Sequence, residues 1–214
     1  MMHTRDLVSR LAANLHPVAP NAVSRSLGRA LVSGLVGNIA LLVALYGVRS
    51  DMPELILTGM FWVRLAFPAA LIVTATRLAE RLARPGAPFA YAWLAVALPI
   101  VTMLAVTAGI LLATPPGYRL QLVLGSTWQV TTADIVFLSL PSLAVMMRAM
   151  KKLAPTRLAL AGASAGFLAG AQGGLVYSLY CSEMSVPFWG VWYVLAIAMT
   201  ACIGATVGPR YLRW

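Results

Sequence analysis

Long uncharged apolar runs alternate with short polar connections along most of the chain. A helix needs about 20 apolar residues to cross the roughly 30 Å hydrocarbon core of a bilayer. We predict a spanning helix in each apolar run, over residues 30–48, 55–76, 90–114, 133–147, 158–180 and 188–207. The pattern therefore predicts an all-α polytopic membrane protein with six transmembrane helices. Residues 30–214 form its transmembrane domain, and residues 1–29 form a separate amphipathic segment.

The basic residues are distributed unevenly between the two sides that six spans define. All but three of the 16 Lys and Arg residues fall on the side of the N-terminus and the C-terminus. Cytoplasmic loops carry an excess of Lys and Arg, so both termini are predicted to lie in the cytoplasm. The run 133–147 is needed for this result, because without it the basic residues 148–157 would move to the other side.

Composition narrows the class of protein further. The chain is 60% hydrophobic and 10% charged, whereas soluble domains are about 25% charged. These values exclude a soluble enzyme and a disordered protein. We attribute the net charge of +10 to topology and to affinity for anionic lipids, and we expect no direct binding to nucleic acid.

The fifth span carries a glycine every four residues. These are Gly162, Gly166, Gly170 and Gly174, which fall on one face of a helix. Glycines at this spacing let a second helix approach closely. The sequence does not decide which helix is the partner. It belongs either to this chain, where Gly204 and Gly208 repeat the spacing, or to another copy in a homo-oligomer.

Arg64 is a cation inside the second span, and it is expected to face protein because a charge in the bilayer is costly. One interpretation is a substrate or proton path lined by Arg64 and Asp134. The other, which we favour, is a structural arginine that caps main-chain carbonyls or pairs with Asp134. Pro68, Pro99 and Pro141 lie within spans and are interpreted as kinks.

Residues suited to catalysis or metal binding are sparse. The two histidines, His3 and His16, precede the first span, and no His, Cys or carboxylate cluster has metal-ligand spacing. Nucleophile and phosphate-binding motifs are absent. We therefore predict that the protein is not an enzyme and requires neither a cofactor nor a metal.

The two cysteines lie at different depths of the predicted membrane. Cys202 is about 15 residues, or about 22 Å, further into the bilayer than Cys181. A disulfide needs Cα atoms within about 7 Å, so the two are not expected to bridge. We interpret Cys202 as a small packing residue. Cys181 is interpreted as an exposed thiol at the outer face, either a sensor or a bystander.

The segment before the first span has an apolar stripe. Leu7, Leu11 and Leu15 recur every four residues in a predicted short helix that ends at Pro17. Such a segment lies on a membrane surface or folds into the groove of a partner. The stripe is narrow and lacks aromatic residues, which favours a protein partner.

Several pieces of sequence, taken in order, carry a family resemblance. They are the leucine-rich segment leading to Pro17-Val18, Trp62 with Arg64, Arg84-Pro85-Gly86, Leu153-Ala154-Pro155, YSLYCSE at 177–183, Trp192-Tyr193, and the end at 208–214. Together they resemble the six-span membrane anti-sigma factors of the negative regulator of sigma F family. The resemblance extends over nearly the whole chain.

The resemblance implies a protein of the bacterial inner membrane. Its cytoplasmic N-terminus would sequester an extracytoplasmic-function sigma factor and release it on an envelope stress signal, metal or oxidant. The residues that this implies for partner binding are Leu7, Leu11, Leu15, Pro17 and Val18.

Cys181 matches a family cysteine near the outer face that is associated with sensing. A second family cysteine, near the start of the fourth span, is missing here, where the sequence reads Thr-Thr-Ala-Asp at 131–134. This departure weakens the case for a two-thiol switch. The alternatives are a small transporter or channel subunit with Arg64 and Asp134 lining a path, and an assembly subunit held by the glycine ladder.

Overall fold

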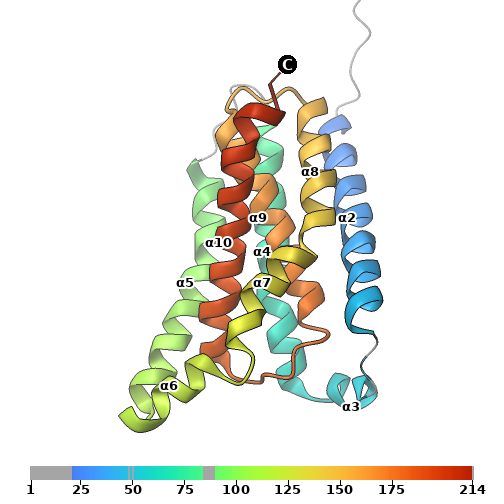
Figure 1. The fold of residues 1–214 in the computed structure, drawn as a ribbon. Helices are drawn as coiled ribbons and strands as arrows, with labels where there is room; N and C mark the ends of the chain where they lie inside the picture. The colour runs from blue at the N-terminus through green and yellow to red at the C-terminus, as the bar shows by residue number, and fades with distance from the viewer. Residues whose placement is uncertain (1–20, 48, 50, 84–89, 214) are drawn as a thin grey trace, which may run out of the picture.

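The computed structural model describes residues 21–47, 49, 51–83 and 90–213, whose regular secondary structure is helical (Figure 1). The helices are α2 (Ala22–Tyr46), α3 (Met52–Ile56), α4 (Gly59–Leu82), α5 (Ala90–Ala113), α6 (Pro116–Leu124), α7 (Trp128–Leu138), α8 (Leu140–Lys152), α9 (Leu158–Tyr177) and α10 (Val186–Tyr211). Within these described ranges, six helical segments are long and apolar enough to cross a membrane. This finding confirms the predicted all-α membrane fold.

The first and fourth spans differ in length from the prediction. Helix α2 begins at Ala22, so residues 22–29, which we assigned to the N-terminal segment, form its first two turns. The fourth apolar segment covers Pro116–Lys152 and comprises α6, α7 and α8. It is therefore much longer than the predicted 133–147.

A proline accounts for the interruption between α7 and α8. Pro141 has no amide hydrogen to donate to the preceding turn, and its ring crowds the carbonyl there. Helix α7 ends at Leu138, and α8 begins at Leu140. By contrast, α4 and α5 continue through Pro68 and Pro99.

Helix α9 lies at the centre of the bundle, between α10 and α4 and beside α7 and α8 (Figure 1). A Cβ atom added at Gly162 would lie 2.1 Å from the main-chain oxygen of Gly204, and one at Gly166 would lie 2.2 Å from that of Thr200. At Gly170 it would lie 2.0 Å from the hydroxyl oxygen of Thr200. The glycines therefore allow the backbones of α9 and α10 to touch.

The partner of the glycine ladder is thus a helix of the same chain, and the ladder gives no support to a homo-oligomer or to an assembly subunit. Gly174 does not belong to the close contact, because the nearest atom to an added Cβ is 3.7 Å away on the ring of Tyr193. Gly173, which the spacing missed, faces α7 instead, with the oxygen of Ile135 only 2.7 Å from an added Cβ.

The start of α2, the end of α8 and the C-terminus lie at one end of the bundle, and α3 and α6 lie at the other (Figure 1). We call the first the basic end, because it carries cationic residues such as Arg25, Arg29, Arg148 and Lys152. The second is called the α3–α6 end.

Candidate functional site

The turn that joins α9 to α10 occupies the α3–α6 end, and we call residues 178–185 the 178–185 loop. It begins as a continuation of the helix: the amide of Ser178 donates to the oxygen of Gly174, and that of Cys181 donates to the oxygen of Tyr177. The loop then returns into α10 at Val186. Side chains from three other parts of the chain bind it.

Arg64, on α4, binds the loop from inside the bundle. Its side chain is 1% exposed, and Nη1 donates to the main-chain oxygens of Cys181, at 2.7 Å, and Glu183, at 3.2 Å. The guanidinium carbon also lies 5.8 Å from the ring centre of Phe61 and 5.9 Å from that of Trp189. Carbonyl dipoles and ring faces thus stabilise a cation that water does not reach.

This geometry corresponds to the carbonyl-capping role and not to an Arg64–Asp134 pair. Asp134, on α7, instead interacts with the phenol of Tyr46 at the end of α2. Among the residues that the structure describes, no ion pair joins Arg64 to Asp134. A path lined by these two side chains therefore gains no support from their contacts.

Arg49 binds the same loop from the outside. Its Nη1 donates to the oxygens of Tyr180 and Cys181, each at 3.1 Å. The other nitrogens form a bidentate ion pair with Asp51, with Nε at 2.5 Å and Nη2 at 2.7 Å from the two carboxylate oxygens. The hydrogen bond from Arg49 lowers the pKa of the Asp51 carboxyl. From the sequence, Arg49 was expected only to be one of the few basic residues on the side opposite the termini.

The second half of the loop, from Glu183 onwards, forms hydrogen bonds with α6 and with the turn between α6 and α7. A carboxylate oxygen of Glu183 accepts hydrogen bonds from the amide of Ser126, at 2.7 Å, and from its hydroxyl. The main-chain oxygen of Glu183 also accepts the indole N–H of Trp189 at 3.0 Å. Ser185 donates to the oxygen of Leu122 at 2.8 Å. The 178–185 loop therefore contacts three segments that are distant from it in sequence.

Cys181 lies inside this junction. Its residue surface is 2% exposed, so the prediction of an exposed thiol was wrong. The loop turns back into the bundle and places the side chain in the core cluster with Phe188, Trp189 and Tyr193. Burial raises the pKa of the Cys181 thiol, which keeps it protonated and slows its reaction as a nucleophile.

Cys202 also differs from its predicted role, because it lies on an exposed face of α10 and does not pack inside. The two cysteines are free thiols, as the difference in depth predicted. The sequence could not show which face of α10 points outward, since both faces of that helix are apolar.

Thr131, the first residue of the Thr-Thr-Ala-Asp stretch at 131–134, lies close to the same junction. It is fully buried, and its hydroxyl oxygen is 3.2 Å from that of Tyr177. Tyr177 in turn accepts the amide of Cys181 at 2.9 Å. Tyr177 therefore contacts both the start of α7 and the backbone of the 178–185 loop at Cys181.

The family described as negative regulator of sigma F matches residues 11–214. The chain belongs to this family. The resemblance read from the sequence is thereby confirmed.

Two relatives of the negative regulator of sigma F family align over the full length of both chains. The probable anti-sigma-F factor of Azospira oryzae is 38% identical over 213 residues. The anti-sigma-F factor of Caulobacter vibrioides is 36% identical over 218 residues. No solved structure matches the chain.

The residues predicted to bind a partner, Leu7, Leu11, Leu15, Pro17 and Val18, lie outside the described residues. Within the described ranges, no group of three or more His, Cys, Asp or Glu side chains is placed to hold a metal ion. Among the described residues, the candidate functional site is therefore the junction where Arg49 and Arg64 bind the 178–185 loop.

Proposed function

We propose that this chain is a membrane-bound anti-sigma factor that holds an extracytoplasmic-function sigma factor through its N-terminal segment. The observation that carries the proposal is the family match over residues 11–214, together with full-length relatives named as anti-sigma-F factors. The proposed location is the bacterial inner membrane, with the basic end and both termini in the cytoplasm. The concentration of cations at one end supports this orientation.

The proposed contact is the apolar stripe of Leu7, Leu11 and Leu15, continued by Pro17 and Val18. An amphipathic helix binds by laying such a stripe into a hydrophobic groove of its partner. Helix α2 begins at Ala22, so only a few residues separate the stripe from the first span. A sigma factor held there would be kept at the membrane, away from RNA polymerase.

The proposed release begins at the junction around the 178–185 loop, with Cys181 as the sensing residue. Because the thiol is buried, an oxidant or metal reaches it only when the loop opens locally. An envelope oxidant or metal that modified this buried thiol would force added volume into a packed core. Such overpacking costs about 1–3 kcal/mol. The close backbone contact between α9 and α10 offers a stiff route by which a shift at the loop reaches the basic end.

The size of the required shift limits how release operates. Changing the bound fraction from 99:1 to 1:99 needs about 5.5 kcal/mol of difference between the two states. Overpacking at Cys181 supplies only part of that amount. The contacts of Arg49 and Arg64 with the loop must therefore change as well, since hydrogen bonds to charged groups are worth about 1.5–3 kcal/mol each.

Capture of the partner by the full chain tests the proposal. Tagged full-length protein in lipid nanodiscs is incubated with lysate of the source cells, beside a Leu7→Asp/Leu11→Asp variant. A matched control, Ser9→Asp/Ala13→Asp, adds the same charges at the same spacing on the other face of the expected helix. We expect mass spectrometry to identify a sigma factor with the wild type and the control, and not with the Leu variant. Absence of any sigma factor from the wild-type sample would contradict the proposal.

A further inference from the structure

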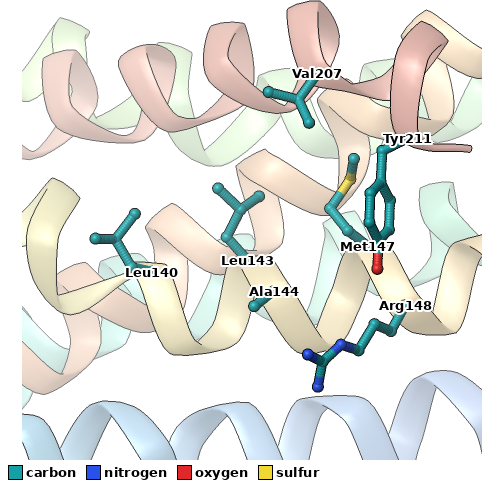
Figure 2. Close-up of a pocket in the computed structure, with 7 residues that line it drawn as sticks. All are labelled: Leu140, Leu143, Ala144, Met147, Arg148, Val207 and Tyr211. Atoms are coloured by element: carbon teal, nitrogen blue, oxygen red, sulfur yellow. The ribbon is translucent and has the colours of Figure 1, made fainter.

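Two grooves flank α8 at the basic end of the bundle. The first runs between α8 and α10, with a volume of about 440 Å³ (Figure 2). Leu140, Leu143 and Met147 follow one another along its α8 side, and Val207 faces them from α10. This wall is apolar, and it runs along the axis of α8, part of the fourth membrane-spanning segment.

The polar residues of the first groove lie together at its basic end. Tyr211 and Arg148 are found there, and Figure 2 shows Arg148 directed away from α10 and towards α2. The ammonium group of Lys151 lies 5.0 Å from the ring centre of Tyr211. A tyrosine ring and a lysine at the end of an apolar wall are typical of the headgroup level of a membrane.

The second groove lies between α2 and α8, with a volume of about 530 Å³. Arg25, Arg29, Arg148 and Lys152 line it together with Ser26, and the lining contains no carboxylate. Among the described residues, none of these four cations forms an ion pair. Ala22, the first residue of α2, is also in the lining, so the positive end of that helix dipole adds to the same potential.

Arg148 lines both grooves and joins them. The combined surface offers a cation-lined hollow for a negative group and, directly beside it, an apolar groove for a chain. A free anion or an acidic peptide would use only the cation-lined hollow. A molecule that fits both parts has an anionic head and a hydrocarbon tail.

We propose that the face formed by α2, α8 and α10 binds an anionic phospholipid. Its phosphate lies in the hollow between Arg25, Arg29, Arg148 and Lys152, and one acyl chain lies along the groove between α8 and α10. The bound lipid holds the first turns of α2 against α8 at the headgroup level. The site is independent of the sigma-factor proposal, because it uses only described residues of the spans.

Native mass spectrometry of the full-length protein tests the site. Delipidated protein is offered phosphatidylglycerol or phosphatidylcholine with identical acyl chains, and bound lipid is measured. We expect phosphatidylglycerol to be retained in preference to phosphatidylcholine. Each cation near a membrane surface contributes about fivefold in affinity for anionic lipid, so Arg25→Gln/Arg148→Gln should lower retention by about 25-fold.

Matched variants distinguish a specific lipid-binding site from nonspecific attraction to the positive charge at this end of the bundle. Arg77→Gln removes an exposed arginine at the same end, on α4, and should leave retention unchanged. Ala144→Trp fills the apolar groove without altering charge and should lower retention, whereas Ala97→Trp, at an exposed position of α5, should not. All of these positions are exposed, so the variants are expected to fold, and their unfolding temperatures verify this.

Three results would overturn the proposal. One is equal retention of the two lipids. Another is an equal loss for Arg77→Gln and for Arg25→Gln/Arg148→Gln, which would indicate nonspecific attraction. The third is full displacement of the lipid by inorganic phosphate with no effect of Ala144→Trp, which would identify a site for a free anion.

Discussion

The Nη1 atom of Arg64 lies 2.7 Å from the main-chain oxygen of Cys181, although 117 residues separate the two along the chain. The same oxygen accepts a hydrogen bond from Arg49. Two cations from different segments therefore converge on one carbonyl of the 178–185 loop. This arrangement gives Nη1 of a buried arginine two main-chain acceptors in place of a carboxylate, and it makes the loop depend on the position of α4.

Replacing Arg64 by methionine should loosen the loop more than it unfolds the bundle. Arg64→Met removes both hydrogen bonds from Arg64, but Arg49 and Trp189 still donate to the same carbonyls. We expect a loss of about 2 kcal/mol in the free energy of unfolding, measured by thermal unfolding in detergent. We also expect faster alkylation of Cys181.

The control for this change is Arg77→Met, which removes an exposed arginine from the same helix. It should leave both the unfolding temperature and the alkylation rate near those of the wild type. Equal behaviour of the two variants would show that the Arg64 contacts do not secure the loop.

The buried thiol of Cys181 should react slowly and with a steep dependence on pH. Burial raises the pKa of Cys181, and only the thiolate is nucleophilic, so its alkylation by iodoacetamide should rise about tenfold per pH unit below that pKa. A thiol moved by one residue, in Cys181→Ala/Ser182→Cys, lies at an exposed position and should react faster at every pH. Both proteins carry Cys202→Ala. Equal rates would contradict the burial of Cys181.

The same pKa shift predicts how stability depends on pH. The folded state binds the Cys181 proton more tightly than the unfolded state, whose thiol pKa is about 8.5. The contribution is complete below that pH and is lost as pH rises towards the folded pKa. Between pH 8.5 and 10, the unfolding temperature of the wild type should therefore fall more than that of Cys181→Ala.

The Arg49–Asp51 pair predicts the opposite dependence at low pH. Its hydrogen bond lowers the pKa of Asp51, so the stability that it contributes is present above the unfolded carboxyl pKa of about 3.9 and is lost as pH falls through the folded value. Between pH 5 and 3, the unfolding temperature should fall less for Asp51→Asn than for the wild type. An identical fall in both proteins would show that the pair does not act on the fold.

Two glycines of α9 should respond differently to the same substitution. Gly166→Ala places a methyl group 2.2 Å from the oxygen of Thr200, so α9 and α10 must separate, at about 1–3 kcal/mol. Gly174→Ala meets nothing closer than 3.7 Å and should be neutral. Thermal unfolding of the two variants measures the difference. Equal destabilisation would place the close contact elsewhere.

Much of the fold could be predicted from the sequence because membrane-spanning helices need long apolar runs, and such runs are visible without any tertiary information. The spacing of Gly162, Gly166 and Gly170 also predicted a close helix contact. It could not predict that Gly174 lies outside this contact, since that depends on where the large side chain of Tyr193 enters between the helices.

The candidate site was less accessible to sequence reasoning. Arg64 was recognised by its cost in a bilayer, but its acceptors are main-chain oxygens, which every residue carries and no pattern marks. Cys181 was expected to be exposed because it follows the end of a span. Its burial arises from the turn of the 178–185 loop back into the bundle, and that turn is secured by contacts distant in sequence.

Inhibition of transcription by the full-length protein is the decisive measurement for the proposed anti-sigma activity. The captured sigma factor and RNA polymerase core are combined with nanodisc-embedded protein, and run-off transcripts are measured. We expect the wild type and Ser9→Asp/Ala13→Asp to reduce transcription, whereas Leu7→Asp/Leu11→Asp should not. Equal inhibition by all three proteins, or inhibition by none, would contradict the claim that the apolar stripe holds the sigma factor.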